Sequence, residues 1–146
     1  MNRMPATEEL LRDHGLRVTP QRMAILDFIR NCRDHPTADE VYHAVRQAHP
    51  AISLNTIYKS LEAFETSGLV TRFVIGDRGK YRYDFNTETH IHHLCSECGR
   101  VADVPIEDAE RLENFVDSIA RDQDGSVEKA EISLIGKCRE CLARRD

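Results

Sequence analysis

Two Cys-x-x-Cys pairs constrain the fold of this chain more than any other feature. Cys95 and Cys98 form the first pair, and Cys138 and Cys141 form the second. Four thiolates at this spacing are typical of a tetrahedral structural zinc site, in which no position is open to a substrate. Disulfides and free thiols are the alternatives for the same residues. The pattern predicts a bound Zn²⁺ that closes a small domain in the C-terminal half of the chain.

The sequence has no feature of an exported or membrane protein. No apolar run approaches the ~20 residues that a membrane-spanning helix needs, and residues 1–5 lack the apolar core of a signal peptide. We therefore expect a cytoplasmic chain without a membrane partner, and disulfides rarely persist in that compartment. The fifth cysteine, Cys32, stands alone among apolar residues, and we expect a buried, inert thiol there.

Charge is divided unevenly along the chain. Residues 1–83 carry 12 Lys or Arg and 10 Asp or Glu, a net charge of +2, whereas residues 84–146 carry 8 and 15, a net charge of −7. The total of −5 on its own argues against a nucleic-acid partner. The division instead indicates two modules with different partners, and we expect domains at residues 1–85 and 86–146.

The first of these modules has the element order of a winged helix. Capping signals mark its helices, because Thr19 precedes Pro20, Thr37 and Glu40 form a capping box, and Ser53 precedes an apolar periodic run. Two strands follow around a tight turn. The expected elements are helices at residues 6–14, from 20, from 37 and from 54 to about Gly68, and strands at 70–75 and 80–85.

The helix that begins after Ser53 would enter the major groove of DNA in a winged helix-turn-helix protein. Small polar and hydroxyl side chains at its start reach phosphates and base edges, and cations there and in the hairpin neutralise phosphates. A small helical domain with a solvated polar face is the alternative. The residues expected to contact DNA are Ser53, Asn55, Thr56, Tyr58, Lys59, Arg78 and Lys80.

A second group of candidate metal ligands lies beside the first cysteine pair. If residues 90–95 form a strand, its two-residue period places His90 and His92 on one face and His93 on the other. Asp84 ends the preceding strand, and Asp103 lies on an expected hairpin partner at residues 100–104. Nitrogen and oxygen donors of this kind suit iron, manganese or zinc. A His-x-His at the surface without a metal is the alternative.

The remaining residues predict a small α/β module. Residues 127–135 alternate as a strand does, and residues 107–121 form an amphipathic helix with an apolar stripe that we expect to be buried: Leu112, Phe115, Val116 and Ile119. The expected fold class is therefore α/β (α+β), an N-terminal winged helix-turn-helix domain followed by a small α/β dimerisation and metal-binding domain. A small sheet with a free edge often pairs with its twin. We expect a homodimer on a palindromic operator in double-stranded DNA.

Four motifs together resemble the ferric uptake regulator (Fur) family over nearly the whole chain. They are GLRVTPQR at residues 15–22, HPTADE at 35–40, SLNTIY at 53–58 and HIHHLCSECG at 90–99. The resemblance implies a dimeric, metal-responsive transcriptional repressor and not an enzyme. It also implies DNA contacts in the first motif, at Arg17, Gln21 and Arg22.

Within the family, the pattern is most similar to the peroxide-sensing branch. That branch binds a regulatory Fe²⁺ or Mn²⁺ through three His and two Asp, in addition to the structural Zn²⁺. The iron-sensing branch typically has Glu where Asp84 stands, and Ile91 replaces a carboxylate of a further metal site found in several iron sensors. Lys59 matches neither branch and leaves the operator sequence open. The positions that match the regulatory ligands are His35, Asp84, His90, His92 and Asp103.

The resemblance also implies a mechanism. His35 belongs to the DNA-binding half, so a metal held by all five ligands fixes the two halves in one orientation and selects a DNA-competent state. Reaction of hydrogen peroxide with bound Fe²⁺ oxidises a ligand histidine, His35 or His90, and releases the DNA, whereas Mn²⁺ represses without reacting. The alternative within the family is an iron- or manganese-responsive repressor without peroxide sensing. Alternatives from other classes are a metallohydrolase that uses the His and Asp cluster and a thiol switch that uses the four Cys.

Overall fold

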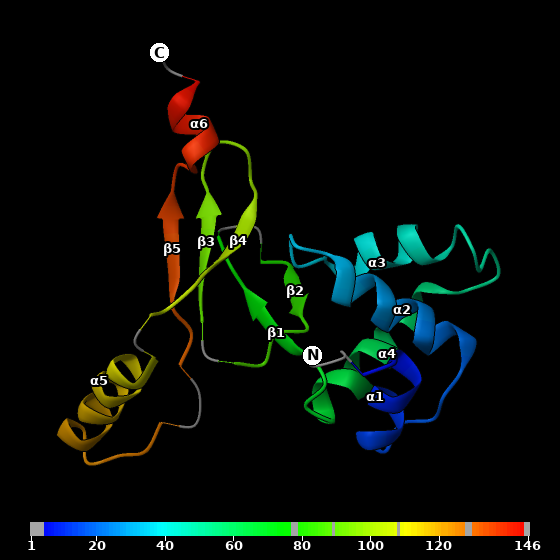
Figure 1. Cartoon of the computed structure of the whole chain (residues 1–146), viewed down its shortest axis with the longest axis horizontal. Coiled ribbons are helices and arrows are strands. Elements are labelled where there is room, and N and C mark those ends of the chain that lie inside the picture. The colour runs from blue at the N-terminus through cyan, green and yellow to red at the C-terminus, as the bar shows by residue number, and fades with distance from the viewer. Residues whose placement is uncertain (1–4, 77–78, 89, 108, 128–129, 145–146) are drawn as a thin grey trace. The chain divides into compact units, whose positions relative to one another are not determined.

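Figure 1 shows the chain as a computed structural model, which describes residues 5–76, 79–88, 90–107, 109–127 and 130–144. The chain forms two compact units, Met1–Thr87 and Glu88–Asp146. We call them the first unit and the second unit, and each is described by itself. None of the described helices is both long enough and apolar enough to cross a membrane.

The first unit has the element order of a winged helix-turn-helix domain, as the sequence predicts (Figure 1). Its helices begin at the expected caps. The Thr19 hydroxyl accepts a hydrogen bond from the Arg22 amide at 3.2 Å, and the Ser53 hydroxyl accepts one from the Thr56 amide at 3.1 Å. The elements are α1 (Thr7–Asp13), α2 (Pro20–Asn31), α3 (Ala38–Val45), α4 (Leu54–Thr66), β1 (Thr71–Val74) and β2 (Tyr81–Asp84).

The hydrophobic core of the first unit lies between its helices. Side chains at helical spacing on α2, α3 and α4 point inward and are fully buried, and each contributes roughly 1.5–3 kcal/mol by leaving water. Gly68 ends α4 with a φ of +76°, the left-handed conformation expected of a residue just past a helix. The largest buried side chains of this core include Leu11, Ile25, Leu26, Val41, Ile57, Leu61 and Phe64.

Strands β1 and β2 form the expected antiparallel hairpin, with Thr71 opposite Asp84 and Val74 opposite Tyr81. Two residues of its turn at 76–79, Asp77 and Arg78, lie outside the described residues. Strand β2 has a second neighbour, because Thr37 forms an isolated bridge with Arg82. The segment before α3 is therefore attached to the hairpin.

The second unit contains a three-stranded sheet with the order β4-β3-β5. Strand β3 pairs with β4 in antiparallel fashion, as predicted, and with β5 in parallel fashion. A helix joins β4 to β5, and a short helix that sequence analysis did not predict ends the described chain. The elements are β3 (Ile91–Cys95), β4 (Val101–Val104), α5 (Ala109–Asp122), β5 (Ser133–Gly136) and α6 (Arg139–Ala143).

Two predictions for the second unit are wrong. The strand expected at residues 127–135 begins at Ser133, opposite His92 near the start of β3, and the described residues 127 and 130–132 lie outside it. Residues 128 and 129 lie outside the described part of the chain. The apolar stripe of α5 is not buried within one chain, since Phe115 is 61% exposed and Ile119 is 45% exposed. Leu112 and Val116 of the same stripe are half-buried.

Candidate metal centres and nucleic-acid interface

The four cysteines of the two pairs meet in the second unit. Cys95 ends β3, Cys98 lies in the loop that follows, Cys138 caps α6, and Cys141 lies within α6. Their Sγ atoms all lie within 4.8 Å of one another. The Sγ atoms of Cys98 and Cys138 are 3.9 Å apart, close to the roughly 3.8 Å edge of a tetrahedron with Zn–S bonds of about 2.3 Å.

Backbone amides prepare this site for thiolates. The Cys95 sulfur accepts hydrogen bonds from the amides of Cys98 at 3.5 Å and Cys138 at 3.3 Å, and these lower the pKa of Cys95 to about 5. The neighbouring sulfurs, Cys138 first, raise the pKa of Cys141 to about 12. Four adjacent sulfurs cannot all ionise without a cation, so the donor set fits Zn²⁺.

Two ion pairs connect the cysteine pairs to each other, and sequence analysis did not predict them. Lys137, just before Cys138, lies 2.8 Å from Glu97 of the first pair. Arg100, just after Cys98, lies 3.1 Å from Glu140 of the second. In the sequence, these ion pairs are indicated only by two features. A Glu precedes the second cysteine of each pair, and a Lys or Arg lies next to the other pair.

A second cluster of donors lies at the start of β3 and on β4. The Nε2 atoms of His90 and His92 are 2.9 Å apart, and they lie 3.2 Å and 3.6 Å from Oδ1 of Asp103. Cis ligands of one cation, with bonds of about 2.1 Å, are separated by roughly 3 Å. Two imidazoles and one carboxylate in a triangle are typical of a site for Fe²⁺ or a similar divalent cation. We call this group the triad.

The orientation of His90 suits a ligand. Its Nδ1 atom lies 2.6 Å from the Glu88 carbonyl oxygen, so Nδ1 carries the proton and Nε2 presents its lone pair to the triad. The His93 side chain instead lies beside Gly136 of β5. A Cβ atom added at Gly136 would be 3.8 Å from the Nε2 atom of His93. The two-residue period of the strand separates His93 from the triad.

The first unit also contains a pair of His and Asp side chains that can bind a metal. Nδ1 of His35 lies 3.5 Å from Oδ1 of Asp84, and both side chains are 5% exposed. Asp84 ends β2, and its Oδ1 atom also accepts a hydrogen bond from the Asn86 amide at 2.8 Å. The ring of Phe73 contacts the His35 ring edge-to-face at 5.5 Å. A buried imidazole beside a buried carboxylate is a donor pair suited to a divalent cation.

Most residues predicted to contact DNA lie at the surface of the first unit. On α4 and its cap, Ser53, Asn55, Tyr58 and Lys59 are exposed, and Thr56 is half-buried. Lys80 beside β2 is exposed and lies 3.9 Å from Asp39. Arg78 lies outside the described residues. Before and within α2, the remaining predicted contacts are exposed or half-buried: Arg17, Gln21 and Arg22.

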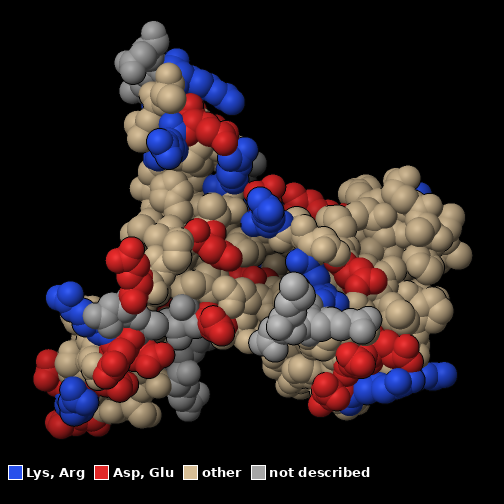
Figure 2. All heavy atoms as spheres, in the orientation of Figure 1, with Lys and Arg blue, Asp and Glu red and all other residues tan. Residues whose placement is uncertain are grey.

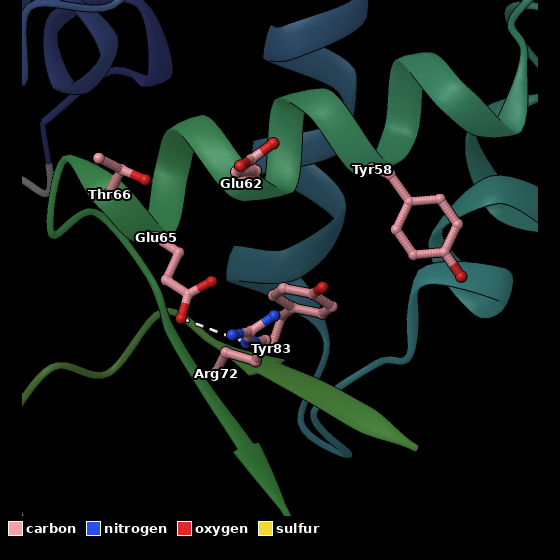
Figure 3. Close-up of a pocket in the computed structure, with 6 residues that line it drawn as sticks. All are labelled: Tyr58, Glu62, Glu65, Thr66, Arg72 and Tyr83. Carbon is pink, nitrogen blue, oxygen red and sulfur yellow. Dashed lines mark ion pairs between the residues drawn. The ribbon is translucent and has the colours of Figure 1, made fainter. Parts of the chain in front are cut away.

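A cavity of about 610 Å³ lies between α4 and the hairpin of the first unit (Figure 3). Glu65 and Arg72 form an ion pair across it at 3.2 Å, and the guanidinium of Arg72 lies 4.1 Å from the centre of the Tyr81 ring. Tyr83 lines the cavity from β2, and burial raises the pKa of its hydroxyl. The Glu65–Arg72 ion pair connects the hairpin to α4, the helix expected to enter the major groove.

The model of the ferric uptake regulator family matches residues 13–135. The chain belongs to the ferric uptake regulator family. It is 37% identical over 131 residues to the peroxide-responsive repressor PerR of Staphylococcus aureus (strain Mu50 / ATCC 700699), covering 90% of this chain and 86% of that protein. Members of the Fur family are transcriptional regulators and not enzymes, and they are DNA-binding dimers.

Two solved structures extend the comparison of this Fur-family chain. The peroxide stress regulator of Campylobacter jejuni matches with a TM-score of 0.70 and 30% identity, covering 92% of this chain and 98% of that chain. The ferric uptake regulator of Pseudomonas aeruginosa, solved with manganese, matches with a TM-score of 0.68 and 30% identity, covering 93% and 99%. The chain is therefore a metal-dependent repressor of the Fur family.

Proposed function

We propose that this Fur-family repressor senses hydrogen peroxide through a regulatory divalent cation that both units bind. The triad supplies three donors, and His35 and Asp84 supply two more. The observation that carries the proposal is the triangle of donor atoms in the triad, with sides of 2.9, 3.2 and 3.6 Å. Three nitrogens and two oxygens suit Fe²⁺ and Mn²⁺.

The covalent connection between the units supports a shared site. Asp84 ends β2 in the first unit, and His90 immediately precedes β3 in the second. Six residues of extended chain span at most roughly 20 Å, so these two candidate ligands stay within that reach in any arrangement of the units. A cation that binds all five donors favours the arrangement of the two units in which these donors meet. It increases the fraction of molecules in that arrangement because it binds that arrangement more tightly than any other.

The chain contributes the remaining parts of the proposed mechanism. Fe²⁺ held by these five donors would supply redox chemistry with peroxide. The O–O bond of H₂O₂ would break, one oxygen atom would be inserted into a ring C–H bond of His35 or His90, and the other oxygen atom would leave as water. The oxidised ring is a poorer ligand, so the cation is lost and the DNA is released.

The structural Zn²⁺ has a separate role in this proposal. Cys95, Cys98, Cys138 and Cys141 hold it with four thiolates, a closed set that leaves no site for peroxide. It stabilises the second unit, whose exposed apolar residues include Phe115, Ile119 and Ile135. We propose that a second copy of the chain covers these residues. The resulting dimer presents two copies of α4 to a palindromic operator.

DNA binding with and without metal tests the proposal. The probe is a palindromic duplex selected from a random library with the Mn²⁺-loaded, zinc-containing protein, and fluorescence anisotropy follows binding. Mn²⁺ is expected to strengthen binding at least tenfold, and His92→Ala is expected to abolish that gain. His93→Ala is the matched control, since His93 shares β3 but not the triad, and it is expected to keep the gain.

Peroxide separates the two branches of the family. The Fe²⁺-loaded protein is expected to lose DNA binding after one equivalent of H₂O₂, and the Mn²⁺-loaded protein is expected to keep it. If the Fe²⁺-loaded protein binds DNA equally well before and after peroxide, the peroxide-sensing proposal is wrong. The protein would then be an iron- or manganese-responsive repressor. No gain from either metal would overturn the regulatory site itself.

A further inference from the structure

The backbone at His35 adopts a conformation that its sequence disfavours. Its φ is +51°, in the left-handed region that few residues other than glycine occupy. The next residue is Pro36, and a residue before proline prefers an extended backbone. Such conformations are energetically unfavourable and persist only where neighbouring groups hold them.

The guanidinium of Arg82 holds this backbone. Its Nη1 atom donates to the carbonyl oxygens of Asp34 at 3.2 Å and of His35 at 3.0 Å. The Arg82 side chain is 22% exposed, so these charge-assisted bonds form partly out of water and are stronger than surface bonds.

Two further contacts attach the same segment to β2 and to α3. The amide of Tyr83 donates to the Pro36 carbonyl at 3.0 Å. Glu40 accepts from the Thr37 amide at 2.7 Å in the capping box of α3, and its carboxylate lies 4.0 Å from Arg82. Arg82 thus lies on the strand that carries Asp84 and contacts the segment that carries His35 and the start of α3.

We propose that Arg82 is a positioning residue for the regulatory cation, which holds His35 in its left-handed conformation beside Asp84 before a cation binds. This inference rests on the proposed regulatory site. Arg82 touches neither donor atom, and it acts through the backbone of His35. The first unit then offers two prearranged ligands, so cation binding does not have to stabilise the disfavoured backbone.

Arg82→Met removes the guanidinium but keeps much of the side-chain volume. Loss of a group that orients a metal ligand typically lowers metal affinity about 10–100-fold. We expect a loss of this size in Mn²⁺ affinity of the zinc-loaded protein, measured by the electron paramagnetic resonance signal of free Mn²⁺. Arg82→Lys keeps one charged donor and is expected to recover part of the affinity.

Arg72→Met is the matched control. Arg72 lies on the other strand of the same hairpin and is ion-paired with Glu65. We expect its loss to change Mn²⁺ affinity less than threefold. Equal losses for Arg72→Met and Arg82→Met would show a general effect of the hairpin and would overturn the inference.

A double-mutant cycle with His35→Ala separates positioning from a structural role. If Arg82 acts through His35, Arg82→Met has no further effect on Mn²⁺ affinity in the His35→Ala background. An undiminished further loss in that background would overturn the positioning role. A normal Mn²⁺ affinity of His35→Ala itself would overturn the proposed shared site, which is a different failure.

Discussion

The two units of this chain are stabilised by different means. The first unit has a continuous hydrophobic core, in which Ile25, Leu61 and Phe64 are completely buried. Among the described residues of the second unit, the only buried apolar side chains are Val101 and the zinc-site residues Cys95 and Cys141. A unit with so few buried residues needs a metal or a partner to remain folded.

Charge follows the same division. The α5 range of the second unit includes Glu110, Glu113, Asp117 and Asp122, and Figure 2 shows acidic side chains gathered over that helix. The DNA-contacting residues are predicted for the first unit, and its first 83 residues carry a net charge of +2. The first unit therefore has a core that can fold by itself, whereas the folding of the second unit depends on a metal or a partner chain.

Removal of the structural zinc gives the largest expected effect. Cys138→Ser is expected to unfold the second unit, because structural Zn²⁺ contributes about 10–16 kcal/mol of apparent binding free energy in small domains. The helices of the first unit are expected to persist. Thermal unfolding, monitored by circular dichroism, should then show one transition fewer than in the unsubstituted protein. Cys32→Ser is the control, because Cys32 ends α2 outside the zinc site and burial raises its pKa.

Truncation within the core of the first unit is expected to have the next largest effect. Leu61→Ala leaves a cavity where the side chain is completely buried, which costs about 2–5 kcal/mol. Phe115→Ala on the exposed stripe of α5 is expected to leave the unfolding free energy of the monomer nearly unchanged. Urea unfolding at low protein concentration measures both. Equal losses would contradict the division between the units.

A charge on the exposed stripe of α5 is expected to affect assembly and not folding. Phe115→Glu should weaken self-association at least tenfold, because it places a carboxylate on apolar surface that a second copy covers. Sedimentation equilibrium measures the dissociation constant. Asn114→Glu adds the same charge on the adjacent exposed position of α5 and should leave self-association intact. The reverse pattern would place the dimer interface on another surface.

The ion pairs around the zinc site are expected to have the smallest effect. Lys137→Glu should speed loss of zinc to a chelator, because it places a carboxylate beside Glu97, with which Lys137 is paired at 2.8 Å. Glu97→Lys combined with Lys137→Glu restores opposite charges and should restore slow release. The coupling expected for so exposed a pair is about 0.2–1 kcal/mol. If the double variant still releases zinc quickly, the faster release does not come from loss of the ion pair.

The sequence predicted the first unit closely, because its signals are local. The caps Thr19, Thr37 and Ser53 and the terminal glycine Gly68 each act within one helical turn. Of the strand expected from residue 127, the described residues before Ser133 lie outside β5, since an alternating pattern does not reveal where pairing with the parallel partner β3 begins. The exposed stripe of α5 shows that a periodic apolar pattern predicts burial without saying against which chain.

The candidate sites were predictable to the extent that spacing reveals them. The cysteine spacing predicts four sulfurs that the structure brings within 4.8 Å, and the period of β3 separates His92 from His93. The role of Arg82 was not predictable, because it depends on the left-handed backbone of His35, 47 residues earlier in the chain. Assignment of all five donors to one cation stays a prediction.

Mass analysis of the histidine peptides tests the proposed peroxide mechanism most directly. The zinc-containing protein is loaded with Fe²⁺ without oxygen, treated with one equivalent of H₂O₂ and cleaved with a protease. We predict a gain of one oxygen atom on the peptide that carries His35 or on the one that carries His90, in proportion to the loss of DNA binding. The Mn²⁺-loaded protein should show neither change. Loss of DNA binding with both peptides unmodified and the zinc-site cysteines oxidised would contradict the account and assign sensing to the thiols.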